Sequence, residues 1–378
     1  MKKRQEHLTL KRLQVLCDQI PDARRQSGNY KHRLSDVLIL CLLGMICGYE
    51  TWEEIWDYAK AKRLFLWRAL GLTHGIPSPS TMRRVMGMIR PEDLERVYRQ
   101  WVGPYIGSCL GKQLIVDGKT IRGASNMGNV NLHMVSVWVH EDGLTMGQIK
   151  TEEKSNEITA IPELLSALDI RGGVLSMDAM GCQKAIAKQI IEQEGQYLLA
   201  VKGNQPTLLT EIREYFDWAM TDPVEKKFLH THTHIEKGHG RITKWKVCVC
   251  DASWFEGKAE WLMLRTFVRV ERTCTRKGQT TSEEAFFISS VQAEAATFHR
   301  LVRNHWSIEN RLHWSLDSSF HEDDSLLHDV NAAQNMSLLR KIALAAIRGD
   351  SSCKASVNRK RKKAAVDDAF ALSLLAAC

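Results

Sequence analysis

Apolar side chains within residues 1–108 recur at intervals of three and four positions, which is the period of one helix face. This pattern predicts helices over residues 34–47, 52–60, 64–70 and 92–101. A turn rich in Gly, Pro and Ser at residues 75–80 precedes a further helix that carries Arg83 and Arg84. A turn before a helix with paired arginines is compatible with a helix-turn-helix DNA reader, and an ordinary helical hairpin explains it equally well.

From residue 112 the period changes to that of short strands. The pattern predicts strands over residues 113–116, 133–139, 144–150, 173–177 and 197–201, and helices over residues 157–168 and 183–194. The turn Glu141-Asp142-Gly143 marks a hairpin between the second and third strands. Three strands, a helix, a strand, a helix and a strand is the order of an RNase H-like core, with a mixed sheet flanked by helices.

Residues 206–290 interrupt this order. A helix followed by strand-like pieces at residues 244–250, 261–270 and 285–289 predicts a β-rich insertion with its own sheet. An apolar stripe along residues 293–317 predicts a long helix that returns to the core. The predicted fold is α+β, divided into a helical DNA-binding domain (1–108), a core in two parts (109–205 and 291–350), the insertion (206–290) and a basic C-terminal tail (351–378).

The 378-residue chain carries a formal charge of +8, which favours a polyanionic partner, nucleic acid first and an anionic membrane surface second. None of the ten cysteines forms a CxxC pair, so reduced and mostly buried thiols are expected. The longest apolar stretch, residues 37–47, is too short to span a bilayer, and no signal peptide is evident. The expected location is the cytoplasm.

Two aspartates directly follow predicted strands. Asp117 ends the apolar run 114–116, and Asp178 ends the run 174–177. Sheets of this kind place their ligands at the carboxyl ends of strands, and neighbouring strands would bring the two carboxylates together. Close aspartates repel each other, and Mg²⁺, which prefers hard oxygen ligands, would relieve that repulsion. Either aspartate taken singly could instead be a turn former or a helix cap.

The pattern defines a third acidic residue less sharply. Glu309 adjoins the apolar stripe of the predicted helix, and His313 and Asp317 fall on the same helical face. Asp317 and the acidic run 322–324 compete with Glu309 for this role, although such a run is more often a solvated loop. Local physics therefore leaves the choice open.

Several long strings carry a resemblance to one family. They are Asp117-Gly118-Lys119-Thr120-Ile121-Arg122-Gly123, residues 154–162, Met177-Asp178-Ala179-Met180-Gly181-Cys182-Gln183, residues 201–205 and the stretch from His305 to Trp314. Over nearly the whole chain these strings closely resemble the H-repeat-associated transposases, an insertion-sequence family linked to Rhs elements. The resemblance implies an RNase H-like catalytic domain, a β-rich insertion before the glutamate helix, and a DDE triad at Asp117, Asp178 and Glu309. The chain departs from the family at Gly238-His239-Gly240-Arg241, which lacks the usual Ser before it and acid after it.

Other side chains have two interpretations each. Positive or polar groups near the acids could contact DNA, or else balance acids and form turns; they are Lys119, Arg122, Lys202, Asn204, Arg303 and Arg311. The basic run 359–363 could add phosphate contacts or be a solvated tail. Trp306 and Trp314 could stack on an unpaired base, although helical spacing favours core packing. His230, His232 and His234 would share one strand face, where a polar face is a simpler interpretation than a metal site.

The sequence therefore predicts a transposase that cuts phosphodiester bonds at element ends and joins the 3′-hydroxyl to target DNA with two Mg²⁺ ions, for which Mn²⁺ can substitute. Arg83 and Arg84 are expected to help recognise the DNA ends. The expected partner is double-stranded DNA, the expected synaptic form is a homodimer, and the expected place is the nucleoid. Two alternatives stay open: a metal-dependent nuclease on the same core, and a domesticated DNA-binding protein that is no longer mobile.

Overall fold

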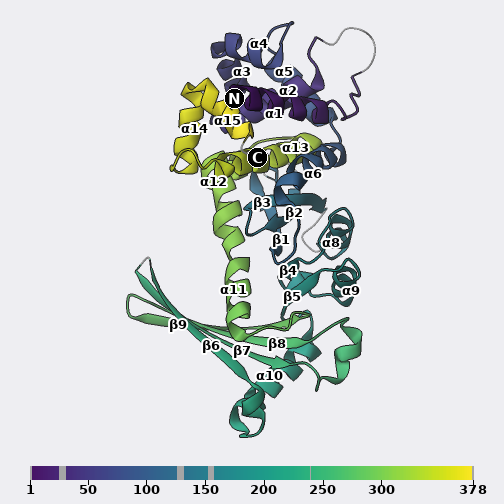
Figure 1. The fold of residues 1–378 in the computed structure, drawn as a ribbon, viewed down its shortest axis with the longest axis vertical. Helices are drawn as coiled ribbons and strands as arrows, with labels where there is room; N and C mark the ends of the chain where they lie inside the picture. Colours follow the sequence, from purple (N-terminus) through teal and green to yellow (C-terminus); the bar gives the residue numbers. More distant parts are fainter. Residues whose placement is uncertain (1, 25–30, 126–131, 152–156, 239, 377–378) are drawn as a thin grey trace.

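The computed structural model describes residues 2–24, 31–125, 132–151, 157–238 and 240–376. Residues 154–156 and His239, which belong to the strings quoted above, lie outside these ranges. Figure 1 shows an elongated molecule with helices from both ends of the chain at the top, a mixed sheet in the middle and long antiparallel strands at the bottom. No helix in the described part of the chain is long and apolar enough to cross a membrane.

The N-terminal region is helical, as the sequence predicts. Its helices are α1 (Lys2–Cys17), α2 (Leu34–Ile46), α3 (Trp52–Ala61), α4 (Arg63–Leu70), α5 (Pro79–Met88) and α6 (Pro91–Ile106). Every residue of α2 is buried, which explains its unbroken apolar run. Thr51 and Glu54 form a capping box at the start of α3, and Ser78 caps α5.

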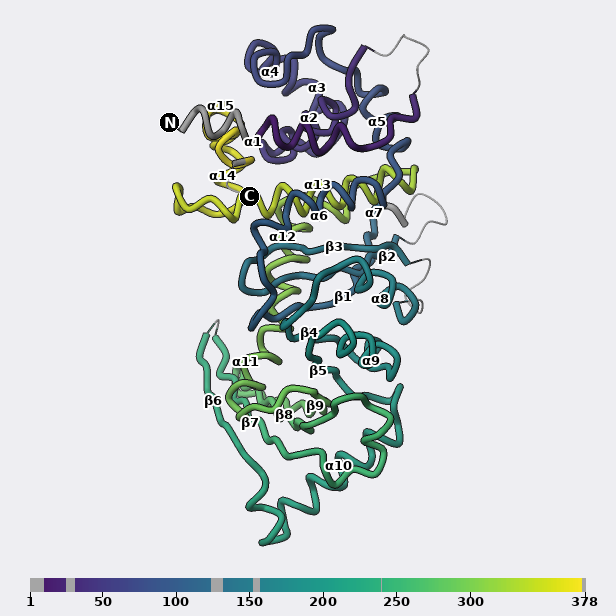
Figure 2. Tube along the Cα trace, turned by 45° about the vertical axis from the view of Figure 1, so that its right-hand side comes forward, coloured from purple at the N-terminus to yellow at the C-terminus, as the bar shows by residue number. Residues whose placement is uncertain are grey.

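The C-terminal helices pack against this N-terminal layer. They are α13 (Val330–Gly349), α14 (Val357–Val366) and α15 (Asp368–Ala376), and they contact α1 and α2 (Figure 2). The structure corrects the expectation of a basic tail, because Lys360 and Arg361 of α14 are buried. Arg361 donates hydrogen bonds to the Met45 carbonyl and to the carboxylate of Glu50. Two of the five basic residues in this run therefore serve packing.

The core of the sheet has the strand order that the sequence predicts. Its strands are β1 (Gln113–Ile121), β2 (Leu132–Val139), β3 (Leu144–Thr151), β4 (Val174–Met177) and β5 (Gln196–Val201). β1, β2 and β3 are antiparallel, whereas β1, β4 and β5 are parallel. The helices α8 (Glu157–Ser166) and α9 (Lys184–Glu192) connect the parallel strands.

The insertion does not form a sheet of its own, which corrects that prediction. After α10 (Pro206–Thr221) come β6 (His230–Gly238), β7 (Arg241–Asp251), β8 (Thr266–Arg276) and β9 (Gln279–Ser289). β9 pairs with β5, so a single nine-stranded sheet runs in the order β3-β2-β1-β4-β5-β9-β8-β7-β6. Buried hydroxyls join the two parts, since Ser289 donates to the Tyr197 carbonyl and Ser290 accepts from the Tyr197 N–H.

The helix that follows the insertion is interrupted rather than continuous. α11 (Ala295–His305) leads to a π-helical turn, η5 (Glu309–His313), and then to α12 (Trp314–Phe320). The Trp314 N–H bonds to the carbonyl of Glu309, five residues earlier, which is the wide spacing of a π-helix. Phe298, Leu301 and Val302 of α11 are buried in a core with strands β7 and β8. This packing fixes α11 on the sheet, and η5 follows α11 along the chain.

Candidate metal centre

Asp117 and Asp178 occupy matching positions on neighbouring strands. β1 pairs with β4 over four residues, the last pair being Val116 with Met177, so each aspartate comes one residue after the paired segment. The sequence placed Asp117 at the end of a strand, but β1 continues beyond it, paired with β2. Asp117 therefore lies where the parallel pairing ends, inside a longer strand that holds it rigidly.

Asp178 is held by the turn that it begins. Its carboxylate accepts the N–H of Met180 at 3.0 Å and caps the short helix η2 (Ala179–Gly181). The side-chain amide of Asn204 donates to the Ala179 carbonyl at 2.5 Å, which fastens the same turn. Asn204 therefore takes the turn role that was one of its two interpretations. Asp178 is both a helix cap and the neighbour of Asp117.

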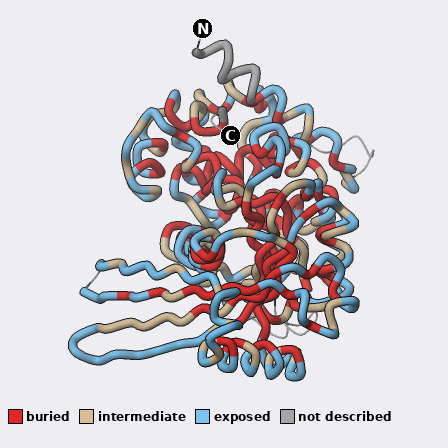
Figure 3. The backbone as a smooth tube through the Cα atoms, turned by 60° about the horizontal axis from the view of Figure 1, so that its bottom comes forward, coloured by how far each residue is buried: buried red, intermediate tan, exposed pale blue. Residues whose placement is uncertain are grey.

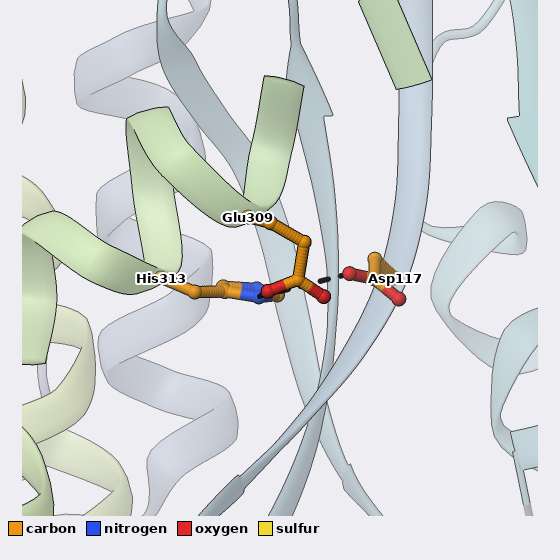
Figure 4. Close-up of side chains that lie close together, drawn as sticks. All are labelled: Asp117, Glu309 and His313. Atoms are coloured by element: carbon orange, nitrogen blue, oxygen red, sulfur yellow. Dashed lines mark ion pairs between the residues drawn. The ribbon is translucent and has the colours of Figure 1, made fainter. Parts of the chain in front are cut away.

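The π-helical turn brings two more side chains to Asp117 (Figure 4). One ligand atom each from Asp117, Glu309 and His313 lie within 4.8 Å of one another. The Nδ1 atom of His313 is 3.4 Å from Oε2 of Glu309 and 3.7 Å from Oδ2 of Asp117. The His313 side chain is 8% exposed and that of Glu309 is 68% exposed, so the cluster has a buried side and an open side.

Charge is crowded at this cluster. The pKa of Asp117 is raised to about 6, chiefly by burial and also by the neighbouring carboxylates of Glu309 and Asp178, against the opposing effect of His313. The hydrogen bond from His313 lowers the pKa of Glu309. Carboxylate oxygens are the ligands that Mg²⁺ and Mn²⁺ prefer, and a divalent cation would relieve the repulsion among these acids. The donor set fits a divalent metal.

Sequence reasoning assigned no role to two histidines at this site. His313 lies between Asp117 and Glu309, and its spacing of four residues from Glu309 was the available signal. The Nδ1 atom of His305 lies 3.0 Å from the Ser176 hydroxyl, and burial lowers the pKa of His305 to about 4. Because Ser176 precedes Asp178 by two residues, a neutral imidazole lies beside this strand end.

The acids that competed with Glu309 have another partner. The Lys119 ammonium bonds to the carboxylates of Asp317 and Glu322, and Glu322 is buried. Lys119 therefore balances nearby acids, which was the alternative to a DNA contact. Glu309, and not Asp317, belongs to the cluster of metal-ligating groups found among the described residues.

Three of the basic residues named from the sequence have exposed side chains. Arg122 starts the short helix α7 (Arg122–Ser125) and lies 3.8 Å from a carboxylate oxygen of Asp323. Lys202 follows β5 and is exposed. Arg311, in the π-helical turn, donates to the His140 carbonyl at 3.3 Å. These side chains remain accessible to a bound strand.

The other named arginines lie farther away or have partners. Arg303 makes two hydrogen bonds, of 3.1 and 2.7 Å, to one carboxylate oxygen of Glu236. Arg83 is exposed on α5, 3.5 Å from a carboxylate oxygen of Glu53, and Arg84 beside it is also exposed. These two arginines lie on α5 and not on the elements that form the metal cluster.

The two tryptophans differ in their surroundings. Trp306 packs one side of its ring against Trp245, with ring centroids 5.1 Å apart, but it is 37% exposed and is not a core residue. Trp314, directly after His313, is 64% exposed. The expectation of core packing is therefore wrong for Trp314.

The alternating histidines lie on one face of β6, as predicted. The rings of His232 and His234 are 5.4 and 4.8 Å from the ring of His299 on α11. Within the described ranges, this group is not among those whose ligand atoms converge on a metal position. A polar strand face packed on α11 is the interpretation that fits.

Comparison with known proteins agrees with this geometry. The family described as "DDE_Tnp_1-associated" matches residues 15–102, and the family described as "Transposase DDE domain" matches residues 110–346. The "H repeat-associated putative transposase YhhI" of Escherichia coli (strain K12) is 37% identical over 377 residues, which cover 98% of this chain and 99% of that protein. The "Putative transposase YncI" of Escherichia coli O157:H7 is 37% identical over 367 residues, which cover 95% of this chain and 93% of that protein.

Among solved structures, the piggyBac transposase synaptic complex with hairpin DNA aligns with 95% of this chain and 79% of that chain, at 8% identity and a TM-score of 0.42. The relatives cover nearly the whole chain, and the domain match includes both aspartates and the glutamate. The resemblance inferred from the sequence strings is confirmed. The chain belongs to the family of transposases with a DDE domain, and its relatives include the H-repeat-associated transposases.

Proposed function

We propose that this protein is an active transposase that cuts DNA at the ends of its element and joins the 3′-hydroxyl to target DNA. The observation that carries the proposal is the cluster in which ligand atoms of Asp117, Glu309 and His313 lie within 4.8 Å, beside Asp178 on the neighbouring strand. The order of β1 to β5 supports an RNase H-like core as the framework. Asp117, Asp178 and Glu309 are the proposed metal ligands.

Two bound Mg²⁺ ions, for which Mn²⁺ can substitute, would supply the Lewis acidity that phosphodiester cleavage and strand transfer require. The protein's own groups have distinct tasks. Asp117 and Asp178 sit on the sheet and a capped turn, so their oxygens are positioned before a ligand arrives. Glu309 is exposed and is steered by His313, which also moderates the repulsion between Glu309 and Asp117. His305 keeps a neutral imidazole beside Asp178.

The proposed partner is double-stranded DNA, held by a synaptic homodimer. Arg122, Lys202 and Arg311 have exposed side chains and are proposed to contact phosphates near the cut. Arg83 and Arg84 of α5 are proposed to help recognise the element ends. Lys119, Asn204 and Arg303 are left out of this set because hydrogen bonds of 2.8 Å or less hold their side chains within the protein.

Matched substitutions on one helical segment test the site. Glu309→Gln removes a proposed ligand, whereas Asp317→Asn changes an acid about two helical turns away that is engaged by Lys119. With labelled DNA from the boundaries of the gene, we expect Glu309→Gln and Asp178→Asn to lower cleavage in Mg²⁺ by about 10³. Asp317→Asn is expected to retain most of the activity.

Two readouts accompany this comparison. Calorimetric titration with Mn²⁺ is expected to show binding that both ligand variants weaken and Asp317→Asn does not. A joining assay with pre-cut ends and a plasmid target separates a transposase from a nuclease. Nicking without joined product would replace the proposal with a nuclease, and unchanged cleavage by Asp178→Asn would remove the proposed site.

A further inference from the structure

The long strands at the bottom of the molecule end in two hairpins that project past α11 in Figure 1, and Figure 3 shows that the ends of the projecting hairpins are largely exposed. We define the arm tip as residues 237–238, 240–244 and 273–282, which surround the turns between β6 and β7 and between β8 and β9. Their side chains include five basic residues: Lys237, Arg241, Lys244, Arg276 and Lys277. The two acids that border the arm tip, Glu236 and Glu283, form ion pairs with Arg303 and Arg272. The composition of the arm tip is therefore strongly one-sided.

Two of these charges face each other. Arg241 on β7 is paired in register with Arg276 on β8, and both residues are exposed. Directly opposed side chains on one sheet face lie close together, and like charges there destabilise the pairing. Within the described ranges, no ion pair joins either arginine to a carboxylate, unlike Arg272 deeper in the sheet, which pairs with Glu283. An external polyanion would relieve this repulsion.

The opposed arginines belong to the sheet face that leads to the metal cluster. Arg241 is four residues from Trp245 on β7, so the two side chains emerge on the same face. Trp245 packs on Trp306, and the Arg272 guanidinium lies 4.8 Å from the Trp306 ring. Glu309 follows Trp306 by three residues. One face of the protein thus connects the arm tip with the proposed cleavage site.

The spacing along this face can be compared with DNA. A strand rises about 3.3 Å per residue, which places Arg276 about 13 Å beyond Arg272. The step from Trp306 to Glu309 adds at most about one helical turn, roughly 5 Å, because α11 crosses the strands at an angle (Figure 1). Successive phosphates of one DNA strand are about 3.4 Å apart along the helix axis, so a duplex on this face reaches the arm tip about five base pairs from the cut.

The shape of the arm limits what it can contact. Its four paired strands lie about 4.8 Å apart, which makes the arm wider than the major groove of about 12 Å that admits a two-stranded ribbon. The arm tip therefore meets the phosphate backbone rather than base edges. Phosphate contacts carry no sequence information, so this grip is expected on any duplex sequence.

We propose that the arm tip, through Arg241 and Arg276, grips the phosphate backbone of duplex DNA about five base pairs from the cleavage site. The position of the grip rests on the proposed function, whereas the binding itself needs no catalysis. Each phosphate neutralised by a protein cation contributes about 0.9 to the slope of log K against log salt concentration. Two arginines therefore account for a slope of about two.

The test compares two pairs of charges in the same insertion. Arg241→Ala with Arg276→Ala removes the opposed pair, and Lys226→Ala with Lys227→Ala removes two exposed charges from the 3-10 helix η3 (Glu225–Phe228). Binding of a random-sequence 30-base-pair duplex is measured by fluorescence anisotropy across salt concentrations in EDTA. We expect the arm variant to lower the slope by about two and the control variant to leave it unchanged. Circular dichroism verifies that both variants fold.

A second measurement locates the grip. In DNA from the boundaries of the gene, single phosphates are replaced by neutral methylphosphonates. Replacements about five steps from the cut are expected to weaken binding by the wild-type protein and not by the arm variant. An unchanged slope in the arm variant, an equal loss in the control, or equal weakening of both proteins at these phosphates overturns the inference.

The outcomes also separate this inference from the proposed function. If the arm variant lowers the slope of log K against log salt concentration but the wild-type protein does not cut DNA in Mg²⁺, the grip is supported and the transposase activity is refuted. If the wild-type protein cuts DNA but the arm variant has the same salt slope, the activity is supported and the grip is refuted.

Discussion

Asp117→Asn is expected to stabilise the metal-free protein while it abolishes metal binding. Burial, with smaller contributions from Glu309 and Asp178, raises the pKa of Asp117 from 3.8 to about 6. One pKa unit corresponds to 1.36 kcal/mol, so the ionised carboxylate costs the fold up to about 3 kcal/mol. Asparagine keeps the shape without the charge, and we expect a gain of about 1–3 kcal/mol above pH 7.

The dependence on pH has a definite sign. A carboxyl group with a raised pKa binds its proton more tightly in the folded state than in the unfolded state. The stability of the wild-type protein therefore falls as the pH rises from about 4 to about 6, and the full cost is present above pH 6. The difference in the free energy of unfolding between Asp117→Asn and the wild type should be small at pH 4 and largest above pH 7.

Urea unfolding followed by tryptophan fluorescence measures this difference in EDTA and in Mn²⁺. At one hundred times its Kd, Mn²⁺ stabilises a protein that binds it by about 2.7 kcal/mol. The free energy of unfolding should therefore rise by this amount in the wild type and stay unchanged in Asp117→Asn. Asp57→Asn, an exposed acid on α3, serves as control and should change stability by less than about 0.5 kcal/mol. A variant no more stable than the wild type in EDTA, or equal stabilisation of both by Mn²⁺, would refute the reasoning.

Three further predictions concern packing, and urea unfolding measures each. Arg361→Ala leaves a buried ion pair broken and should cost about 3–5 kcal/mol, whereas the exposed neighbour Lys362→Ala should cost less than about 0.5 kcal/mol. Gly118→Ala places a methyl group against the buried carboxylate of Glu157 and should cost about 1–3 kcal/mol and reduce DNA cleavage. Lys119→Met leaves two carboxylates without their cation and should cost about 3–5 kcal/mol. Equal stability of Arg361→Ala and Lys362→Ala, or wild-type stability in either of the other two variants, would contradict these expectations.

The core of the fold could be predicted because its signals are local. Short apolar runs such as residues 174–177 mark buried strands, and alternating helices and strands restrict the possible orders. The pairing of β9 with β5 could not be predicted. The apolar pattern of residues 285–289 would be the same whether this strand belonged to a separate sheet or to the sheet of the core. Pairing between strands almost ninety residues apart depends on a free sheet edge, which no local pattern records.

Charge was the least informative signal. The basic run 359–363 looked like a solvated tail, yet Arg361 is buried because Glu50, 311 residues away, accepts its hydrogen bond. At the metal cluster, strand ends pointed to Asp117 and Asp178, and family resemblance favoured Glu309. His313 could not be assigned from spacing alone, because its place between the two acids depends on the π-helical turn. The catalytic roles of the three acids remain predictions.

The packing of the C-terminal helices on α1 and α2 also determines when the protein can mature during synthesis. A ribosome adds about 5–20 residues per second, so the first helices wait roughly 20–70 seconds before α13, α14 and α15 are made. Until then α2, which is wholly buried in the finished fold and mostly apolar, lacks part of its covering surface and is a natural substrate for chaperones. Prematurely terminated chains never acquire that surface. They are expected to be degraded by proteases rather than to accumulate as fragments that compete for DNA.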